Sequence, residues 1–319
     1  MTAAPTAFQS GRRARGRIGD ILLFAVTAAA SLGAIALVGG IAYKLVDGAT
    51  PAFSKFGLGF ITGRVWDPVK SQFGALDFIF GTAVTSFVAL LIAAPLGIGI
   101  ALFLSELAPR GVRDVIGALV EMLAAIPSVI LGLWGILVLG PFVRDHLEPW
   151  LHSALGFLPL FRGSPSAAGI LPAALVLAIM TVPIVASVSR ELFRAVPEEM
   201  EEGAVALGAT RWEMIRGVIL PYTRPGLVAA VILGLGRALG EAIAVTQVVG
   251  DSLGIHWSLF STGDTVASRI ASQYQGAVSK VHVSSIVYLA AILLAISVIV
   301  NFAAQLIVRR FEFQRTGGS

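Results

Sequence analysis

The sequence predicts an all-α integral membrane protein with six transmembrane helices. Of its 319 residues, 56% are hydrophobic and 13% are charged, and the mean hydropathy is +0.86. A water-soluble domain carries about 25% charged residues, so this chain is too apolar for that class. It also contains six apolar stretches of about 20 residues or more, the length that a helix needs to cross a bilayer.

The six spans are expected in succession, with loops that alternate between the two sides of the membrane. Residues 1–19 are polar and basic, and we expect them to form a disordered tail. The first apolar run is too long for a signal peptide and is interpreted as a membrane helix. The spans are predicted at residues 21–46, 76–104, 115–143, 168–188, 227–249 and 283–308, with long loops on one side at 47–74, 144–167 and 251–282.

The distribution of Lys and Arg predicts the orientation of these spans. The N-terminal tail, the turn at 105–114, the loop at 190–225 and the C-terminal tail together hold 14 of these residues, and the opposite loops hold 8 when Lys44 at the end of the first span is included. Positively charged loops remain preferentially in the cytoplasm. Both termini and the 190–225 loop are therefore expected to be cytoplasmic, and the three long loops are expected outside.

Residues 190–225 are the longest charged run of the chain, and they predict a folded helix–turn–helix outside the membrane. Pro197 suits the first turn of a helix, because its missing N–H would have no partner there, and four glutamates follow at the positive helix end. Gly208 is expected to end this helix in the left-handed conformation. Thr210 and Glu213 predict a capping box that opens a second helix.

The second helix of this loop is expected to end at Leu220, before Pro221. Its Trp212 and Met214 are expected to be apolar anchors for a partner protein. A charged loop that docks nothing is the alternative.

The fifth span contains two charged residues, Arg237 and Glu241. Residues four apart lie on the same helix face, so these side chains are expected to pair. A charge near the bilayer centre costs about 2.5–3.5 kcal/mol on insertion scales. Either the arginine contacts an anion on a polar path, with Glu241 balancing it when no anion is present, or the pair locks the helix to its neighbours. Gly234, Gly236 and Gly240 either leave space for a substrate or allow close helix packing.

Glu121 and Ser128 flank Pro127 in the third span and predict a second, weaker polar site beside the same path. Glu121 also lies near the cytoplasmic boundary, where a carboxylate can reach the interface without any function.

The sequence also excludes several kinds of site. It contains no cysteine, so disulfides and Cys-ligated metals are impossible, and its four scattered histidines form no pair of helical spacing that would bind a metal. No phosphate-binding G-x-x-x-x-G-K-[ST] loop occurs, and no nucleophile lies beside a base. We therefore expect no catalytic residue, metal or cofactor in this chain, and its energy must come from a partner or from an ion gradient.

The charged loop resembles the signature of the permease subunits of bacterial ABC importers: E-A-A, three residues, G, nine residues, I, one residue, L-P. The matching positions are Glu202, Gly203, Ala204, Gly208, Val218, Leu220 and Pro221. Gly203 replaces the middle alanine and Val218 replaces the isoleucine, and a glycine inside a helix costs up to about 1 kcal/mol. The resemblance implies the type I ABC importer permease fold, in which this loop inserts into a cleft of a separate ATPase.

Four further stretches are similar to the PstC-type permease subunits of phosphate-specific importers, at residues 75–106, 125–133, 234–241 and 265–271. This resemblance implies that Arg237 and Glu241 serve the phosphate path. It also implies the division of the chain: a cytoplasmic tail (1–19), a first helix with an outer loop (20–74), a permease core of five helices (75–311) that contains the coupling loop (190–225), and a cytoplasmic tail (312–319).

The same resemblance implies the location and the partners. The chain is expected in the bacterial cytoplasmic (inner) membrane, where lipid surrounds it, beside a second, PstA-like permease subunit. Two copies of a cytoplasmic, PstB-like ATPase are expected to bind ATP and Mg, and an external, PstS-like binding protein is expected to deliver phosphate. No nucleic acid is expected among the partners.

Two alternatives to phosphate import remain at this point. One is an ion-coupled secondary carrier, in which Glu241 or Glu121 would take up a proton, although the chain shows no inverted repeat of the kind such carriers often contain. The other is an ABC permease for a different oxyanion such as sulfate or molybdate, because Arg237 alone does not distinguish these anions.

Overall fold

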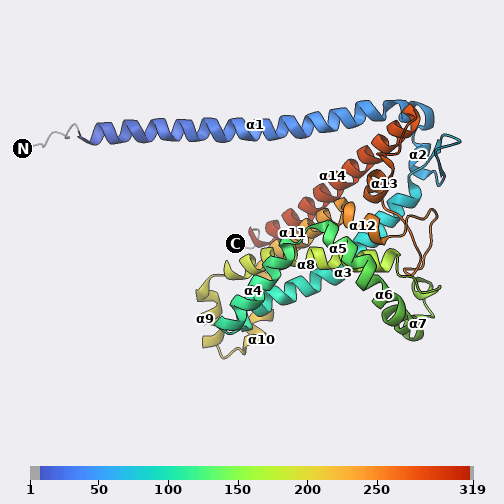
Figure 1. Cartoon of the computed structure of the whole chain (residues 1–319). Helices are drawn as coiled ribbons and strands as arrows, with labels where there is room; N and C mark the ends of the chain where they lie inside the picture. Colours follow the sequence, from blue (N-terminus) through green and yellow to red (C-terminus); the bar gives the residue numbers. More distant parts are fainter. Residues whose placement is uncertain (1–7, 317–319) are drawn as a thin grey trace, which may run out of the picture. The chain divides into compact units, whose positions relative to one another are not determined.

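The computed structural model describes residues 8–316, with side chains for residues 20–306, and it divides into two units, Met1–Gly48 and Ala49–Ser319. The described residues are mostly helical (Figure 1). The helices are α1 (Phe8–Phe56), α2 (Gly59–Thr62), α3 (Leu76–Leu102), α4 (Arg110–Ala125), α5 (Ser128–Trp134), α6 (Gly140–Phe142), α7 (Glu148–Leu155), α8 (Ile170–Arg194), α9 (Glu198–Ala206), α10 (Arg211–Met214), α11 (Leu220–Gly240), α12 (Ile243–Val248), α13 (Val266–Gln273) and α14 (Lys280–Thr316).

Short non-α segments complete the chain. Four π-helical segments continue or join α-helices: η1 (Phe103–Leu107), η2 (Gly135–Leu139), η3 (Val143–Leu147) and η5 (Ile215–Ile219). One 3₁₀ turn, η4, covers Pro159–Phe161. The strands of the described residues, β1 (Trp66–Asp67) and β2 (Gln72–Phe73), form an antiparallel ribbon with Trp66 opposite Phe73.

Six helical segments of the described residues are long and apolar enough to cross a membrane, as the sequence predicts. They are Asp20–Phe56, Leu76–Leu107, Ser128–Leu155, Ile170–Arg194, Arg211–Gly240 and Lys280–Leu306.

The first helix begins earlier than expected. Helix α1 already starts at Phe8, so the expectation of a disordered tail is wrong for residues 8–19, and residues 1–7 lie outside the described part. A helix that is already nucleated extends at the gain of one hydrogen bond per residue, and the arginines of this segment are good helix formers. The same helix runs on to Phe56, which shortens the expected outer loop.

The third span is displaced from its predicted position. The helix breaks at Ile126 and Pro127, both in extended conformation, so α4 ends at Ala125 and the crossing segment runs from Ser128 to Leu155. Proline lacks an N–H and disfavours a helical conformation of the residue before it. The sequence contains this signal, but the predicted span of 115–143 ran through it.

The fifth span differs at both ends. Its helix begins at Arg211 and continues through Pro221, because the π-helical turn η5 immediately before it changes the hydrogen-bond register. The prediction that the second loop helix ends at Leu220 is therefore wrong. At the other end the helix stops at Gly240, Glu241 is extended, and the separate helix α12 follows.

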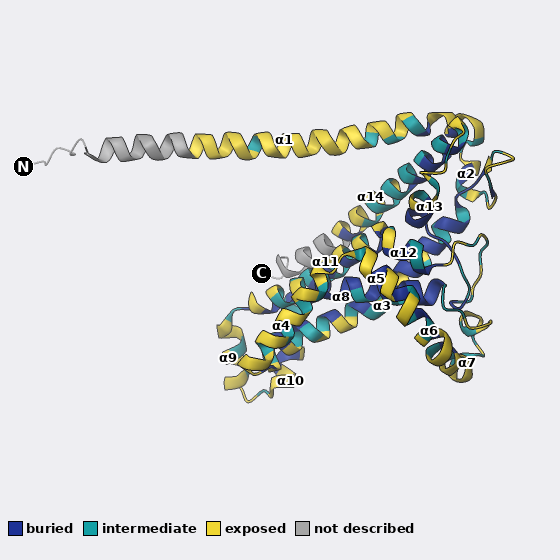
Figure 2. Ribbon diagram, viewed as in Figure 1, coloured by how far each residue is buried: buried dark blue, intermediate teal, exposed yellow. Residues whose placement is uncertain are grey.

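Helix α8 forms the centre of the second unit and packs along α3. In the most apolar window of α8, 72% of the residues are buried, against 28% for each of the other spans of this unit, and Figure 2 shows buried residues along α8 and α3. They approach closely at Gly97, where a Cβ atom would lie 2.8 Å from the Cβ of Val185. Within this unit, α9 and α10 lie at one end, and α2 and α13 lie at the opposite end (Figure 1).

Candidate functional site: a coupling hairpin and an intramembrane ion pair

The coupling hairpin, residues 198–221, has the helix–turn–helix form that the sequence predicts. Gly208 adopts the left-handed conformation, with φ +86°, and the capping box is complete. The Thr210 side chain accepts from the backbone N–H of Glu213 at 3.3 Å, and the Glu213 carboxylate accepts from the backbone N–H of Thr210 at 2.8 Å. The turn therefore has one defined geometry.

The inner side of the coupling hairpin packs against the C-terminal ends of α3 and α8. Met214, Ile215 and Ile219 are buried in one apolar cluster with Ala101 and Phe193. Met214 is only 7% exposed, so the prediction that it is an outward anchor is wrong. Helix periodicity explains the error, because Met214 lies on the face that packs against the spans whereas Trp212, 62% exposed, lies on the free face.

The signature positions are distributed between these two sides. Glu202, Gly203 and Gly208 are exposed, and Ala204, Val218, Leu220 and Pro221 are partly buried. Gly203 has open space around it. Ile219, fully buried beside the matched positions, is the structural anchor that the motif comparison did not single out.

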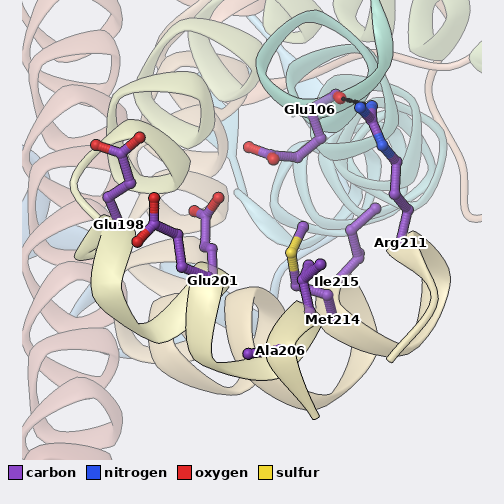
Figure 3. Close-up of a pocket in the computed structure, with 9 residues that line it drawn as sticks. Glu106, Glu198, Glu201, Ala206, Arg211, Met214 and Ile215 are labelled. Carbon is purple, nitrogen blue, oxygen red and sulfur yellow. Dashed lines mark hydrogen bonds between the residues drawn. The ribbon is translucent and has the colours of Figure 1, made fainter. Parts of the chain in front are cut away.

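An acidic groove of about 490 Å³ lies between α9, α10 and η1 (Figure 3). The Arg211 guanidinium at its edge donates to the backbone carbonyl of Glu106 at 3.1 Å. Partial burial raises the pKa of Glu201, and the neighbouring carboxylates of Glu106 and Glu198 raise it further. The groove is lined by Glu106, Glu198, Glu201, Glu202, Val205, Ala206, Arg211, Met214 and Ile215.

Arg237 and Glu241 form the predicted ion pair, at 3.1 Å, but at the end of the helix rather than within it. The Glu241 side chain is 5% exposed and that of Arg237 is 48% exposed. Glu241 also accepts a hydrogen bond from the backbone N–H of Ala244 at 3.3 Å, so one carboxylate neutralises the guanidinium and caps the next helix. Backbone outside regular helix is tolerated at membrane depth where it is packed in protein or lines a cavity.

The three glycines near Arg237 separate into two kinds. Gly234 packs closely on α8, because a Cβ atom there would lie 2.8 Å from Thr181 and 3.0 Å from Val185. Gly236 and Gly240 have nothing within 4 Å of the same position. Close helix packing therefore explains Gly234, whereas Gly236 and Gly240 leave open space near Arg237.

Two short helices that follow helix breaks lie side by side. A Cβ atom at Gly132 of α5 would lie 2.8 Å from the Cα of Ala244 in α12, and one at Gly135 would lie 3.0 Å from Val248. The residue pairs advance in the same direction, so α5 and α12 run parallel. The sequence indicated neither this pairing nor the break at Glu241, where no proline stands.

Glu121 and Ser128 lie on opposite sides of the break at Pro127. Ser128 begins α5, whereas Glu121 in α4 pairs with Arg190 of α8 at 3.2 Å. Arg190 also lies over Gly117, its Nη1 atom 3.1 Å from where a Cβ would stand. This pair ties α4 to the start of the coupling loop, and the role of both residues in a polar path stays a prediction.

A buried charge cluster, which the sequence did not indicate, lies beyond α12. The Arg269 side chain is 6% exposed and forms ion pairs with Asp264 at 2.6 Å and Asp251 at 2.7 Å. Its guanidinium carbon lies 4.8 Å from the centre of the Phe78 ring. Burial raises the pKa of Asp264 to about 6, against the opposing attraction of Arg269. The cluster joins α13 to the first turn of α3.

Comparisons with known proteins agree with this architecture. Residues 93–313 match the family described as binding-protein-dependent transport system inner membrane component. The phosphate transport system permease protein PstC of Mesorhizobium japonicum is 43% identical over 302 residues, which cover 93% of this chain and 92% of the relative. The PstC protein of Haemophilus influenzae is 43% identical over 280 residues, 86% of this chain and 89% of the relative.

Solved structures show the same fold. A bacterial alginate ABC transporter, in complex with an alginate pentasaccharide-bound periplasmic protein, contains a chain that matches with a TM-score of 0.61 at 19% identity, covering 92% of this chain and 96% of that one. The MetNI methionine ABC transporter matches with a TM-score of 0.51 at 20% identity, over 75% of this chain and 94% of that one. These likenesses confirm the predicted ABC importer permease fold, and the chain belongs to the family of binding-protein-dependent transport system inner membrane components.

Proposed function

We propose that the chain is the channel-forming subunit of an ATP-driven importer for inorganic phosphate. The observation that carries the proposal is the joint presence of a built coupling hairpin and an intramembrane Arg237–Glu241 pair in a chain 43% identical to proteins named as phosphate permeases. The hairpin supports the ATP-driven mechanism, and the arginine supports an anionic cargo. The chain itself holds no ATP or Mg in this proposal, because the partner ATPase binds both.

The free side of the coupling hairpin is the docking surface for the ATPase. Leu207 at its tip is 91% exposed and Trp212 is 62% exposed, and large apolar side chains in that position act as interface anchors. The buried side is continuous with the ends of α3 and α8. A displacement of the hairpin by the ATPase therefore displaces the spans.

Phosphate contacts the Arg237 guanidinium during transport. Between transport events the Glu241 carboxylate occupies the position of the phosphate. A guanidinium remains charged and can hold two phosphate oxygens, and half of the Arg237 side chain is accessible. The carboxylate already bonded to it is an internal anion that an incoming phosphate must displace. Competition of this kind keeps binding weak enough for release, which conduction requires.

The open side of the fifth span, at Gly236 and Gly240, faces the path between this chain and a second permease subunit. Nothing lies within 4 Å of where a Cβ atom would stand on either glycine, so a helix backbone or a phosphate ion can approach Arg237 there. The termini and the coupling hairpin are cytoplasmic in this arrangement, and an external binding protein delivers phosphate to the other side.

The test is uptake of radiolabelled phosphate by cells that lack other phosphate carriers. Arg237→Gln should reduce uptake at least 10-fold while the ATPase still co-purifies. Arg110→Gln, at an exposed arginine that begins α4 outside the coupling hairpin, is the matched control for loss of one positive charge. Unchanged uptake by Arg237→Gln would show that the Arg237–Glu241 pair serves helix packing and not the phosphate path. Absence of phosphate uptake in wild type, together with uptake of radiolabelled sulfate or molybdate, would assign a different oxyanion.

A further inference from the structure

Helix α12 is held by an arginine–carboxylate pair at each of its ends. Glu241, two residues before the helix, pairs with Arg237 of α11 at 3.1 Å. The same carboxylate accepts from the backbone N–H of Ala244 in the first turn of α12 at 3.3 Å. Asp251, three residues after the helix, pairs with Arg269 of α13 at 2.7 Å. The first pair belongs to the candidate anion site, and the second lies outside it.

The Arg269 guanidinium is a fixed point of the fold. Its side chain is 6% exposed and also pairs, at 2.6 Å, with Asp264, whose side chain is 1% exposed. Its guanidinium carbon lies 4.8 Å from the centre of the Phe78 ring in the first turn of α3. A Cβ atom at Gly81 of α3 would overlap the backbone carbonyl of Asp264. Because these contacts are buried, Arg269 has little freedom to follow a movement of Asp251.

The backbone at Asp251 is strained. Its φ angle is +47°, and the preceding Gly250 has a φ angle of +93°. Only the glycine adopts this left-handed conformation without steric cost. A residue with a side chain persists there where surrounding contacts fix it, and the pair with Arg269 is such a contact. The pair therefore stabilises the sharp turn that follows α12.

Two backbone hydrogen bonds connect the end of α12 to the segment that contains the buried charge cluster. The Gly263 N–H donates to the carbonyl of Val249 at 3.0 Å, and the Ser252 N–H donates to the carbonyl of Gly263 at 3.2 Å. Gly263 is followed directly by Asp264. Asp251 lies between the two bonded positions, and its side chain adds a third contact. A movement of Asp251 therefore moves the end of α12.

Arg269 is placed to hold α12 and not to bind an anion from solution. Its side chain is 6% exposed, against 48% for Arg237. The carboxylates of Asp251 and Asp264 already contact it, and they repel an incoming anion. Asp251 is the exposed member of the cluster, at 53%. The arrangement is the reverse of the candidate anion site, where the arginine is accessible and the carboxylate of Glu241 is buried.

We propose that Arg269 is a positioning residue for the anion site: by holding Asp251 it fixes α12, and through α12 it keeps the Glu241 carboxylate against Arg237. Helix α12 has only six residues, a length of about 9 Å at 1.5 Å per residue, so a shift at one end reaches the other. Loosening the hold on Asp251 lets Glu241 leave Arg237 more easily. The inference rests on the proposed function, because phosphate is the anion that then takes the place of Glu241.

The test is a double-mutant cycle on phosphate binding, measured by equilibrium dialysis of radiolabelled phosphate against the complete purified transporter. Asp251→Asn removes the charge that Arg269 holds, while Arg269 keeps its pair with Asp264. Phosphate should bind about 3-fold tighter, the size of effect expected for a half-exposed ion pair. In a Glu241→Gln background the same substitution should leave phosphate binding unchanged, because the carboxylate that it positions has no charge left. Residues that act through one another show this non-additivity, and independent structural defects add.

The matched control is Asp145→Asn. Its carboxylate also pairs with an arginine at 2.7 Å, and its side chain is 49% exposed, against 53% for Asp251. Phosphate binding by this variant should equal that of wild type. Arg269→Lys keeps the positive charge but not the planar fork that holds two carboxylates. It should tighten phosphate binding in the same background-dependent way, and it decides the question where the Asp251→Asn complex is not recovered.

The outcomes separate this inference from the proposed function. Equal tightening in the wild-type and Glu241→Gln backgrounds, or no tightening in either, would overturn the positioning role of Arg269 and leave the phosphate importer standing. Absence of phosphate binding by the wild-type complex would overturn the proposed function, and this inference with it.

Discussion

At the scale of single residues, Glu241 is the position with the most consequences. Its carboxylate bonds Arg237 at 3.1 Å and the N–H of Ala244 at 3.3 Å, so it joins two helices as well as two charges. A carboxylate that is 5% exposed is stable only with such partners. Removing its charge changes what Arg237 can bind.

Glu241→Gln keeps the size of the side chain and its capacity to accept from Ala244, but it leaves Arg237 without its internal anion. Phosphate binding to the purified transporter should become about 10-fold tighter, equivalent to about 1.4 kcal/mol, and uptake should slow because release is delayed. Equilibrium dialysis and uptake assays measure the two effects. Asp145→Asn is the control, since its carboxylate pairs with Arg144 at 2.7 Å and is assigned no part in the path. Weaker phosphate binding in Glu241→Gln would contradict the competition between the two anions.

At the scale of elements, the site depends on the contact between α5 and α12. Gly132 brings the two helices so close that even a methyl group would overlap Ala244. Because α12 begins next to Glu241, a shift of α12 moves the carboxylate that holds Arg237.

Gly132→Ala should therefore impair transport more than it impairs folding, with phosphate uptake reduced at least 5-fold and the assembled complex recovered in normal yield. Gly99→Ala adds the same methyl group in α3, where open space surrounds it, and uptake should be unchanged. Equal uptake by both variants would show that the helix contact is not needed for the path.

The helix boundaries show which parts of the fold can be predicted from the sequence. The coupling hairpin was predictable because its signals are local: a proline, a left-handed glycine and a capping box within 17 residues. The break after Ala125 carried a local signal in Pro127, yet a hydropathy window averages over it. The break at Glu241 carried none, because it depends on bonds to Arg237 and Ala244 that form only in the folded chain. Pro221 predicted a helix end that does not exist. The π-helical turn η5 before it, which the sequence does not reveal, accommodates the proline.

At the scale of the whole molecule, stability should depend on pH through Asp264. Burial raises its pKa from 3.8 to about 6, so the folded protein binds a proton more tightly than the unfolded chain does. The contribution of this group to stability is therefore present below about pH 4 and is lost as the pH rises to about 6. The Arg269 contact moderates this loss and does not reverse its sign.

Thermal unfolding of the purified transporter between pH 4 and pH 7 tests this expectation. Wild type should lose stability across that window relative to Asp264→Asn, which has no proton to release there. Asp67→Asn is the control, because the Asp67 carboxylate pairs with Lys70 in the ribbon β1–β2 and not with Arg269. Parallel curves for wild type and Asp264→Asn would mean that Asp264 keeps an ordinary pKa in the folded protein.

The helix from Arg211 to Gly240 is one piece of 30 residues, or about 45 Å at 1.5 Å per residue. It begins in the coupling hairpin and carries Arg237 in its last turn. The residues proposed to contact the ATPase and the anion thus lie on one continuous helix, which contains the π-helical turn η5. In the proposed mechanism, a displacement of the hairpin end of this helix reaches the Arg237 guanidinium without passing through a loop, so closure of the ATPase and movement of the anion contact are directly coupled.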